Sequence, residues 1–278
     1  MTTTPNVPLR GELTFTLPAS AERVWEAIAT AEGISSWFLP TETIETRDGV
    51  VGSVLRMHMG EGSFSDATIT GWDAPRRLVY SEPGWASLTG HDDAAVTPMV
   101  TEFLIEAQSG GTCVLRVVTS AFGTGAEWEH EFFDHMMDSW APFFDNLRLF
   151  LTHFPGQHAT SLSVAAVVPG EVSKVYDALV GALGANAAGK PFDARGLSGV
   201  VERVAEPDGP QGGEGFGSVL VRTTEPLASM LGFLVHDKGD GLADVWLEGY
   251  LFGPDAPKVV DREKSAWTAW IESLAVTA

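Results

Sequence analysis

Glu129 and His130 are the neighbouring side chains whose types best suit acid–base chemistry. On a helical wheel centred on Trp140, Glu129 falls within an apolar stripe and His130 lies on its flank. Burial raises the pKa of a carboxylic acid, so a buried pair of this kind could transfer protons to and from a substrate. The favoured alternative is that Glu129 lies in a solvated first helical turn, where the helix dipole stabilises its negative charge.

Arg116 offers a second kind of chemistry, because an inward guanidinium would bind a carboxylate or phosphate head group. It lies in the run Thr112–Thr119, where apolar residues occupy both parities, so the pattern leaves the inward face open. The cost of burying an unpaired charge favours an outward Arg116 that is an ordinary surface residue.

Metal ligands and nucleophiles are poorly represented. His130 and His135 are five residues apart and would not share a helix face, so we expect no metal site. Cys113 is the single cysteine, which excludes an intrachain disulfide, and the sequence has no Gly-x-Ser-x-Gly elbow. We therefore expect no cofactor and no residue that stands out for covalent catalysis.

The elements that would position these residues occur twice. Leu13–Thr30 and Val164–Gly181, 151 residues apart, share an alternating apolar pattern, a proline and then a helical segment. The segments centred on Trp140 and Trp267 also align, at a spacing of 127 residues, so the second copy is shorter by 24 residues in its middle. This pattern predicts a tandem duplication of one domain.

Between its two ends, each copy alternates apolar and polar residues in the manner of an antiparallel meander. The expected strands are 9–17, 53–59, 63–72, 78–82, 99–107 and 112–120 in the first copy, and 197–205, 217–224, 228–236 and 243–252 in the second. Thr124 and Glu127 have the spacing of a capping box and predict the start of a long amphipathic helix. The fold class is therefore α+β, with domains at 1–155 and 156–278.

Several stretches of the first copy carry a family resemblance: Pro18–Ile28, the Trp37-Phe38 pair, Asp73–Leu78, Gly110–Thr112 and the helix centred on Trp140. Together they resemble the START-like SRPBCC superfamily, and within it the bacterial homologues of the heat-shock ATPase activator C-terminal domain. The resemblance extends over residues 9–153 and, more weakly, 162–275. It implies two helix-grip domains, each a curved antiparallel sheet wrapped around a long C-terminal helix with a cavity between them.

The resemblance also implies that this cavity binds a hydrophobic or amphipathic small molecule. Strand alternation and helical spacing predict an aromatic and methionine-rich lining. The candidate ligand-binding residues are Trp37, Phe38, Met57, Met59, Phe64, Trp85, Phe103, Phe133, Met137 and Trp140. Each could instead pack the core, which is the commoner role of a single apolar residue. In the shortened second copy we expect a reduced or closed cavity.

Three functions fit these observations. The favoured one is a carrier, sensor or scavenger of a hydrophobic small molecule, which needs only the cavity. The second is a cyclase-like or hydrolytic enzyme that uses Glu129, His130 or Arg116. The third, suggested by the resemblance, is a chaperone-regulating module; the eukaryotic activators carry a separate N-terminal domain, whereas eight residues precede the first expected strand here.

Charge and hydropathy exclude other classes. The net charge of −20 opposes binding to phosphate backbones and anionic membrane surfaces, so we expect no nucleic-acid partner. No apolar run approaches the roughly 18 residues of a membrane-spanning helix, and the first residues lack a leader pattern. We expect a cytoplasmic protein without membrane insertion, whose protein partner, if it has one, is not identified by the sequence.

Overall fold

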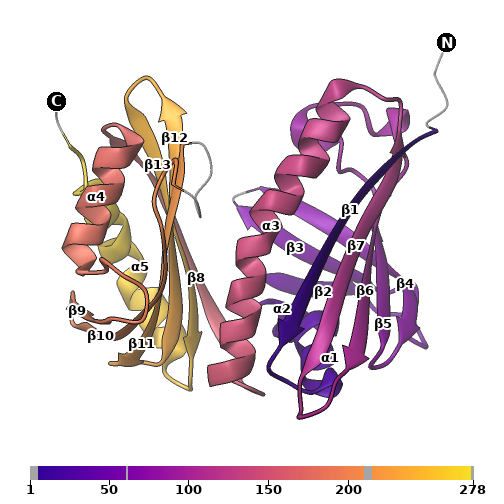
Figure 1. The fold of residues 1–278 in the computed structure, drawn as a ribbon, viewed down its shortest axis with the longest axis horizontal. Helices are drawn as coiled ribbons and strands as arrows, with labels where there is room; N and C mark the ends of the chain where they lie inside the picture. Colours follow the sequence, from indigo (N-terminus) through magenta and orange to yellow (C-terminus); the bar gives the residue numbers. More distant parts are fainter. Residues whose placement is uncertain (1–5, 61, 210–214, 277–278) are drawn as a thin grey trace. The chain divides into compact units, whose positions relative to one another are not determined.

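The computed structural model describes residues 6–60, 62–209 and 215–276, apart from the side chains at positions 138, 139 and 141. The chain divides into two compact units after Gln157, two residues beyond the expected boundary. Each unit combines an antiparallel sheet with helices, so the fold class is α+β (Figure 1).

Among the described residues, the first unit contains a seven-stranded sheet in the order β1-β7-β6-β5-β4-β3-β2. Its strands are β1 (Val7–Leu17), β2 (Thr41–Glu45), β3 (Val54–Gly60), β4 (Ser63–Asp73), β5 (Arg77–Glu82), β6 (Met99–Ala107) and β7 (Cys113–Gly123). The first strand pairs with the last, with Leu13 opposite Val117. Strand β2 is not among the expected strands, because this edge strand is exposed at four of its five residues and has no apolar alternation.

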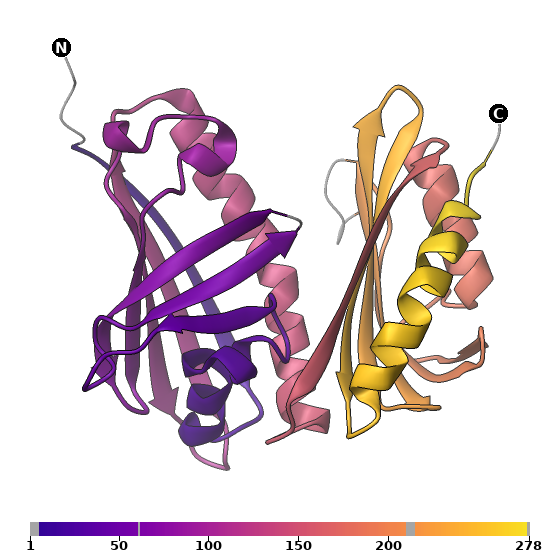
Figure 2. The same cartoon turned by 180° about the vertical axis from the view of Figure 1, so that it is seen from behind.

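Among its described residues, the first unit also contains three α-helices: α1 (Ala21–Ala29), α2 (Ala31–Ile34) and α3 (Glu127–His153). The Ser20 side chain accepts a hydrogen bond from Arg23 N and caps α1, as its position predicts. The sheet curves around α3, which lies along its inner face in both views (Figures 1 and 2). Phe133, Phe144 and Leu147 of α3 are buried there, which matches the apolar stripe in the sequence.

The connection between β5 and β6 is long and contains two short helices, η1 (Ser87–Thr89) and η2 (Asp93–Ala95). The Asp93 carboxylate holds it together by accepting hydrogen bonds from Ala86 N, Ser87 N and Ser87 Oγ. Trp85 anchors it to α3, with its ring centroid 5.1 Å from that of Phe132. The loop is therefore a bonded part of the domain that packs against the first half of α3.

The second unit has, within the described residues, a six-stranded sheet in the order β8-β13-β12-β11-β10-β9. Its strands are β8 (Ala159–Pro169), β9 (Pro191–Ala194), β10 (Leu197–Ala205), β11 (Phe216–Glu225), β12 (Ser229–Gly239) and β13 (Leu242–Phe252). Helices α4 (Val172–Leu183) and α5 (Ala256–Glu272) cover one face of this sheet (Figure 2). Val175, Phe233, Trp267 and Ile271 lie in the core between them.

The two units show the same element order, and the second is the reduced copy. Each begins with a strand and a helix, continues as a meander and ends with a helix packed on the sheet. Residues 83–98 connect β5 to β6, whereas residues 226–228 alone connect the corresponding β11 and β12. The loop that carries Trp85 in the first unit is thus absent from the described part of the second.

Candidate functional site

A cavity of about 210 Å³ lies in the first unit between the sheet and α3. Strands β3 to β6, the segment before β2, the loop after β5 and α3 all contribute to its wall. The lining residues are Leu39, Met57, Met59, Ser65, Glu82, Trp85, Leu88, Met99, Phe132, His135, Met136 and Trp140. Methionine and aromatic side chains dominate, and such a wall adapts its shape to an apolar ligand.

Glu82 places a carboxyl group in this apolar wall. It is the last residue of β5 and is 4% exposed. Ser65 Oγ of the neighbouring strand β4 donates a hydrogen bond to Glu82 Oε1 at 2.6 Å. The other oxygen, Oε2, is buried and has no hydrogen-bond partner in the described part of the chain. One oxygen of the carboxyl group is thus held by Ser65, and the other receives no hydrogen bond from the described residues.

The protonation state of Glu82 changes near neutral pH. Burial raises its pKa to about 7, and the hydrogen bond from Ser65 opposes only part of this effect. Tyr80, on the same face of β5, is buried, and burial together with the charge of Glu82 raises its pKa well above the usual value. Among the described lining residues, His135 of α3 is the other titratable group. A carboxylic acid in an apolar cavity can exchange a proton with what is bound there.

Glu82 is not among the site residues predicted from the sequence, although the strand pattern carries a signal for it. Leu78 and Tyr80 share its parity on β5, and both are buried. The alternation therefore indicated an inward carboxyl group, but the rarity of buried acidic residues argues against that assignment when the sequence alone is considered.

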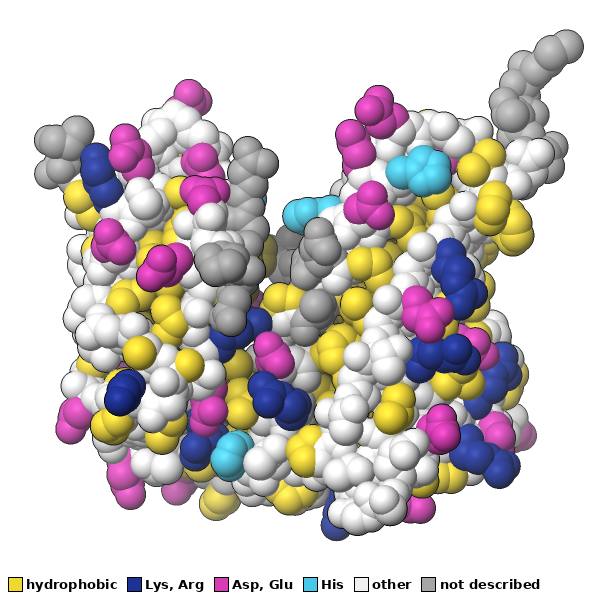
Figure 3. All heavy atoms as spheres, in the orientation of Figure 1, with side chains coloured by type: hydrophobic (Ala, Val, Ile, Leu, Met, Phe, Trp, Pro, Cys, Tyr) yellow, Lys and Arg dark blue, Asp and Glu magenta, His cyan; other side chains and the backbone are white. Residues whose placement is uncertain are grey.

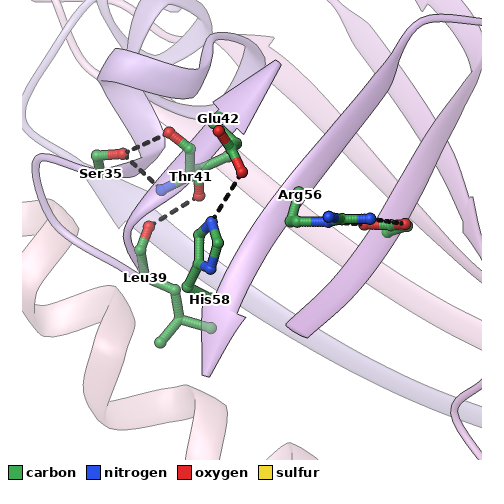
Figure 4. A network of polar contacts seen from close by, with 7 residues as sticks. Ser35, Leu39, Thr41, Glu42, Arg56 and His58 are labelled. Atoms are coloured by element: carbon green, nitrogen blue, oxygen red, sulfur yellow. Dashed lines mark hydrogen bonds and ion pairs between the residues drawn. The ribbon is translucent and has the colours of Figure 1, made fainter. Parts of the chain in front are cut away.

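Hydrogen bonds fix the segment that carries Leu39 at the cavity edge (Figure 4). Ser35 Oγ accepts from Thr41 N at 2.8 Å, and Thr41 Oγ1 donates to the Leu39 carbonyl at 2.8 Å. Beside them, His58 Nε2 lies 3.1 Å from Glu42 Oε1 and joins β3 to the edge strand β2. This rim is therefore tied to both α2 and the sheet.

The structure separates all the predicted ligand-binding residues except Phe64 into two groups. Met57, Met59, Trp85 and Trp140 line the cavity. Others pack against neighbouring side chains: Trp37 and Phe38 contact each other, Phe103 contacts Tyr80, Phe133 contacts Trp85, and Met137 packs in the cluster around Trp85. The second group shapes the cavity by filling the space around it.

Phe64 was expected at the cavity wall, and this placement is wrong. Its side chain is 45% exposed, and the Arg56 guanidinium lies 3.9 Å from its ring centroid. Arg56 in turn donates two hydrogen bonds to Asp66. Because Ser65 takes the inward position on β4, its neighbour Phe64 must point to the outer face.

Glu129 follows neither of the two alternatives expected for it. It is fully buried, and its carboxylate accepts hydrogen bonds at 2.9 Å from Thr124 N, Thr124 Oγ1 and Gly125 N. Burial alone would raise the pKa of Glu129, but these hydrogen bonds outweigh it and lower the pKa. Glu129 is thus an ionised cap of α3 and not a proton donor at the cavity. Since α3 begins at Glu127, it is Glu129 that reaches back to Thr124, and the expected capping box is displaced by two residues.

Arg116 and His130 also lie outside the cavity lining. Arg116 points outward from β7, and its guanidinium lies 3.7 Å from Glu12 Oε1 across the outer face of the sheet. The side chain of His130 is exposed. The polar residues chosen from the sequence therefore do not form a catalytic group at the cavity.

The second unit has a smaller cavity, of about 120 Å³, whose lining includes Arg195, Leu231 and Trp267. The Arg195 guanidinium lies 4.5 Å from the Trp267 ring centroid and 4.6 Å from that of Trp270. It therefore stabilises the two rings by cation–π contact. The difference in volume agrees with the expectation of a reduced cavity in the second copy.

Within the described part of the chain, the charged residues were compared with the arrangements that metal ions and membranes require. The described residues contain no group of three or more His, Cys, Asp or Glu arranged to hold a metal ion. Over the same residues, no helix has the length and apolarity needed to cross a membrane. On the face drawn in Figure 3, described Lys and Arg side chains lie beside acidic ones without forming an extended basic surface.

Solved structures similar to this chain include the di-domain ARO/CYC BexL from the BE-7585A biosynthetic pathway, at 14% identity and a TM-score of 0.43, covering 95% of this chain and 93% of that one. The Aha1 dimer from Colwellia psychrerythraea has 19% identity and a TM-score of 0.40, covering 51% and 96%. Norcoclaurine synthase from Thalictrum flavum has 17% identity and a TM-score of 0.40, covering 53% and 88%. No curated protein matches this chain. A family model, described as activator of Hsp90 ATPase homolog 1-like protein, matches residues 18–152.

Proposed function

Because residues 18–152 of the first unit match the family model described as activator of Hsp90 ATPase homolog 1-like protein, we propose that its cavity binds an apolar small molecule. The protein would then act as a carrier, sensor or scavenger of that molecule. The observation that carries this proposal is the cavity itself, which α3 and the sheet enclose with methionine and aromatic side chains.

The position of Leu88 supports an accessible cavity. Leu88 belongs to the cavity lining, yet 46% of its side chain is exposed to solvent. A side chain that touches both the cavity and the solvent marks the place where a ligand enters. The loop that holds it is bonded through Asp93 and Trp85, so this entrance has a defined shape.

Fluorescence titration with the neutral apolar probe N-phenyl-1-naphthylamine tests the proposal. Wild-type protein should bind the probe saturably, and Leu88→Trp, which enlarges a side chain at the entrance, should weaken binding tenfold or more. Phe122→Trp is the matched control, since Phe122 is 50% exposed and does not line the cavity. Absence of saturable binding, or equal binding by Leu88→Trp, would overturn the proposal.

Catalysis in the same cavity is a second candidate, and the observation that favours it is Glu82. A carboxyl group with a pKa of about 7 can act as a general acid or base near neutral pH. The test begins with native mass spectrometry of protein from its own host to identify a bound molecule. Wild-type protein should convert that molecule and Glu82→Gln should bind it without conversion; an unchanged molecule with both proteins would exclude this role.

A further inference from the structure

Glu82 Oε2 is the polar atom of the cavity that the protein leaves unsatisfied. It is buried, and the described part of the chain provides no donor to it, whereas Oε1 accepts from Ser65. Buried polar atoms in folded proteins have hydrogen-bond partners in the large majority of cases. An unpartnered carboxylate oxygen in an apolar cavity therefore points to a ligand that brings its own donor.

The charges around Glu82 show which kind of donor is missing. No Lys or Arg is among the described lining residues. Tyr80, on the same strand, hydrogen-bonds Thr101, and His135 of α3 is the remaining titratable residue of the wall. The protein thus supplies a negative group without a matching cation, so a positive group on the ligand would complete an ion pair.

We propose, resting on the function proposed above, that the ligand is an apolar amine whose ammonium group binds Glu82 Oε2 while its apolar body lies between the sheet and α3. The ammonium donates a hydrogen bond to the free oxygen and compensates the buried negative charge. Trp85, Phe132 and Trp140 provide aromatic faces for the apolar body and for the cation. The net charge of −20 attracts such cations to the protein.

The size of the cavity limits the ligand. Its volume of about 210 Å³ is below the ~300–1,000 Å³ of pockets that hold drug-sized molecules. The apolar body therefore has one or two rings. Naphthalene derivatives that differ only in their polar group match this size and are suitable test ligands.

Binding of an ammonium ion must be linked to a proton. In the free protein the Glu82 carboxyl group is partly protonated near neutral pH, because burial raises its pKa to about 7. The bound ammonium favours the carboxylate, so the carboxyl proton passes to the buffer as the ion pair forms. Affinity for the amine should therefore rise with pH between about 5.5 and 7.5, while the amine remains charged.

Isothermal titration calorimetry with 1-naphthylmethylamine, 1-naphthalenemethanol and 1-naphthoic acid tests the proposal. The amine should bind at least tenfold more tightly than the neutral alcohol, and the acid should bind most weakly. Glu82→Gln should weaken amine binding tenfold or more and leave alcohol binding within threefold. Titrations at pH 6.5 in two buffers with different protonation enthalpies should show net proton release for wild type and none for Glu82→Gln.

Two controls separate Glu82 from other groups. Glu106→Gln removes one negative charge from an exposed position on β6 and should bind the amine as wild type does. His135→Asn removes the other titratable residue of the wall and should preserve the proton release. If His135→Asn abolishes it, the proton does not come from Glu82 and the inference is wrong.

The remaining outcomes distinguish this inference from the function on which it rests. Equal affinity for amine and alcohol would overturn the amine inference and leave the apolar cavity proposal intact. Tightest binding of the acid would also overturn it, since a protonated Glu82 would then act as the donor. If neither the alcohol nor N-phenyl-1-naphthylamine binds, the proposed function itself fails.

Discussion

A Cβ atom on Gly123 would lie 2.2 Å from Glu129 Oε2, so the end of β7 and the cap of α3 meet at a distance that only glycine allows. The carboxylate at this contact is fixed by hydrogen bonds from Thr124 and Gly125 and cannot move without losing them. The first turn of α3 is thus positioned by a glycine and a buried charge together.

Gly123→Ala should lower the free energy of unfolding by about 2 kcal/mol or more, because it displaces a buried charged acceptor from its donors. Gly11→Ala is the matched control: its Cβ would meet Met137 Sδ at 2.3 Å, but this flexible thioether can turn away. The cost there should stay below about 1 kcal/mol. Urea denaturation of both variants measures the difference, and equal costs would contradict the proposed rigidity of Glu129.

Glu129→Gln should destabilise the first unit by about 1–3 kcal/mol at pH 7, because an amide group cannot accept from all the donors around it. The folded-state pKa of Glu129 is lowered, so its stabilisation is fully present above about pH 4.5 and is lost as the pH falls further. The gap between variant and wild type should therefore shrink between pH 5 and pH 3 in urea titrations. Glu127→Gln, at an exposed position of the same turn, should cost less than about 1 kcal/mol.

Glu82→Gln should have the opposite dependence on pH when no ligand is bound. The folded-state pKa of Glu82 is raised to about 7, so wild type loses stability as the pH rises from about 4.5 to 7, and the loss is constant above that. At about 1.4 kcal/mol for each tenfold change in proton affinity, the variant should gain roughly 3 kcal/mol over wild type at pH 8. At pH 4 the two proteins should be similar. A stability difference that does not change with pH would show that Glu82 is not buried as an acid.

Phe144→Ala should lower the free energy of unfolding by about 3–5 kcal/mol, because Phe144 is 4% exposed and its ring stacks on Phe15 at a centroid distance of 4.3 Å. Phe122→Ala removes the same side chain from an exposed site on β7 and should cost under about 1 kcal/mol. Chemical denaturation measures both. Similar costs would mean that α3 is not packed on β1 as described.

Arg116→Ala and His130→Ala should leave binding of N-phenyl-1-naphthylamine within twofold of wild type. Both side chains lie outside the cavity lining, and the Arg116 pair with Glu12 is an exposed ion pair worth about 0–1 kcal/mol. Fluorescence titration provides the comparison. A tenfold loss of affinity for the probe in either variant would show that the substituted residue belongs to the ligand site.

The sequence predicted the inner strands because each alternates between a buried and an exposed face. The expected strand 99–107 agrees with β6, and 197–205 agrees with β10. Strands β2 and β9 were missed for a physical reason. Both are short strands at the edge of their sheets. Each is held by pairing with one neighbouring strand and therefore needs no repeating apolar pattern.

The sequence predicted those lining residues whose strand parity or helical spacing places an apolar side chain on the inner face. Met57 and Met59 follow from the parity of β3, and Trp140 from the stripe of α3. Glu82 and Glu129 show the limit of this reasoning. Both are buried acids, and their opposite pKa shifts depend on how many donors the folded chain brings to each carboxyl group.

The pairing of β1 with β7 also determines when the first unit can fold during synthesis. Strand β1 leaves the ribosome first, but its hydrogen-bonding partner emerges only after the whole meander has been translated. Until then β1 has no partner strand in its own chain and can pair with the β7 edge of another copy, which is the geometry of a domain-swapped dimer. The second unit repeats the same delay between β8 and β13. Each polypeptide therefore passes twice through a stage at which an unpaired strand can pair with another copy.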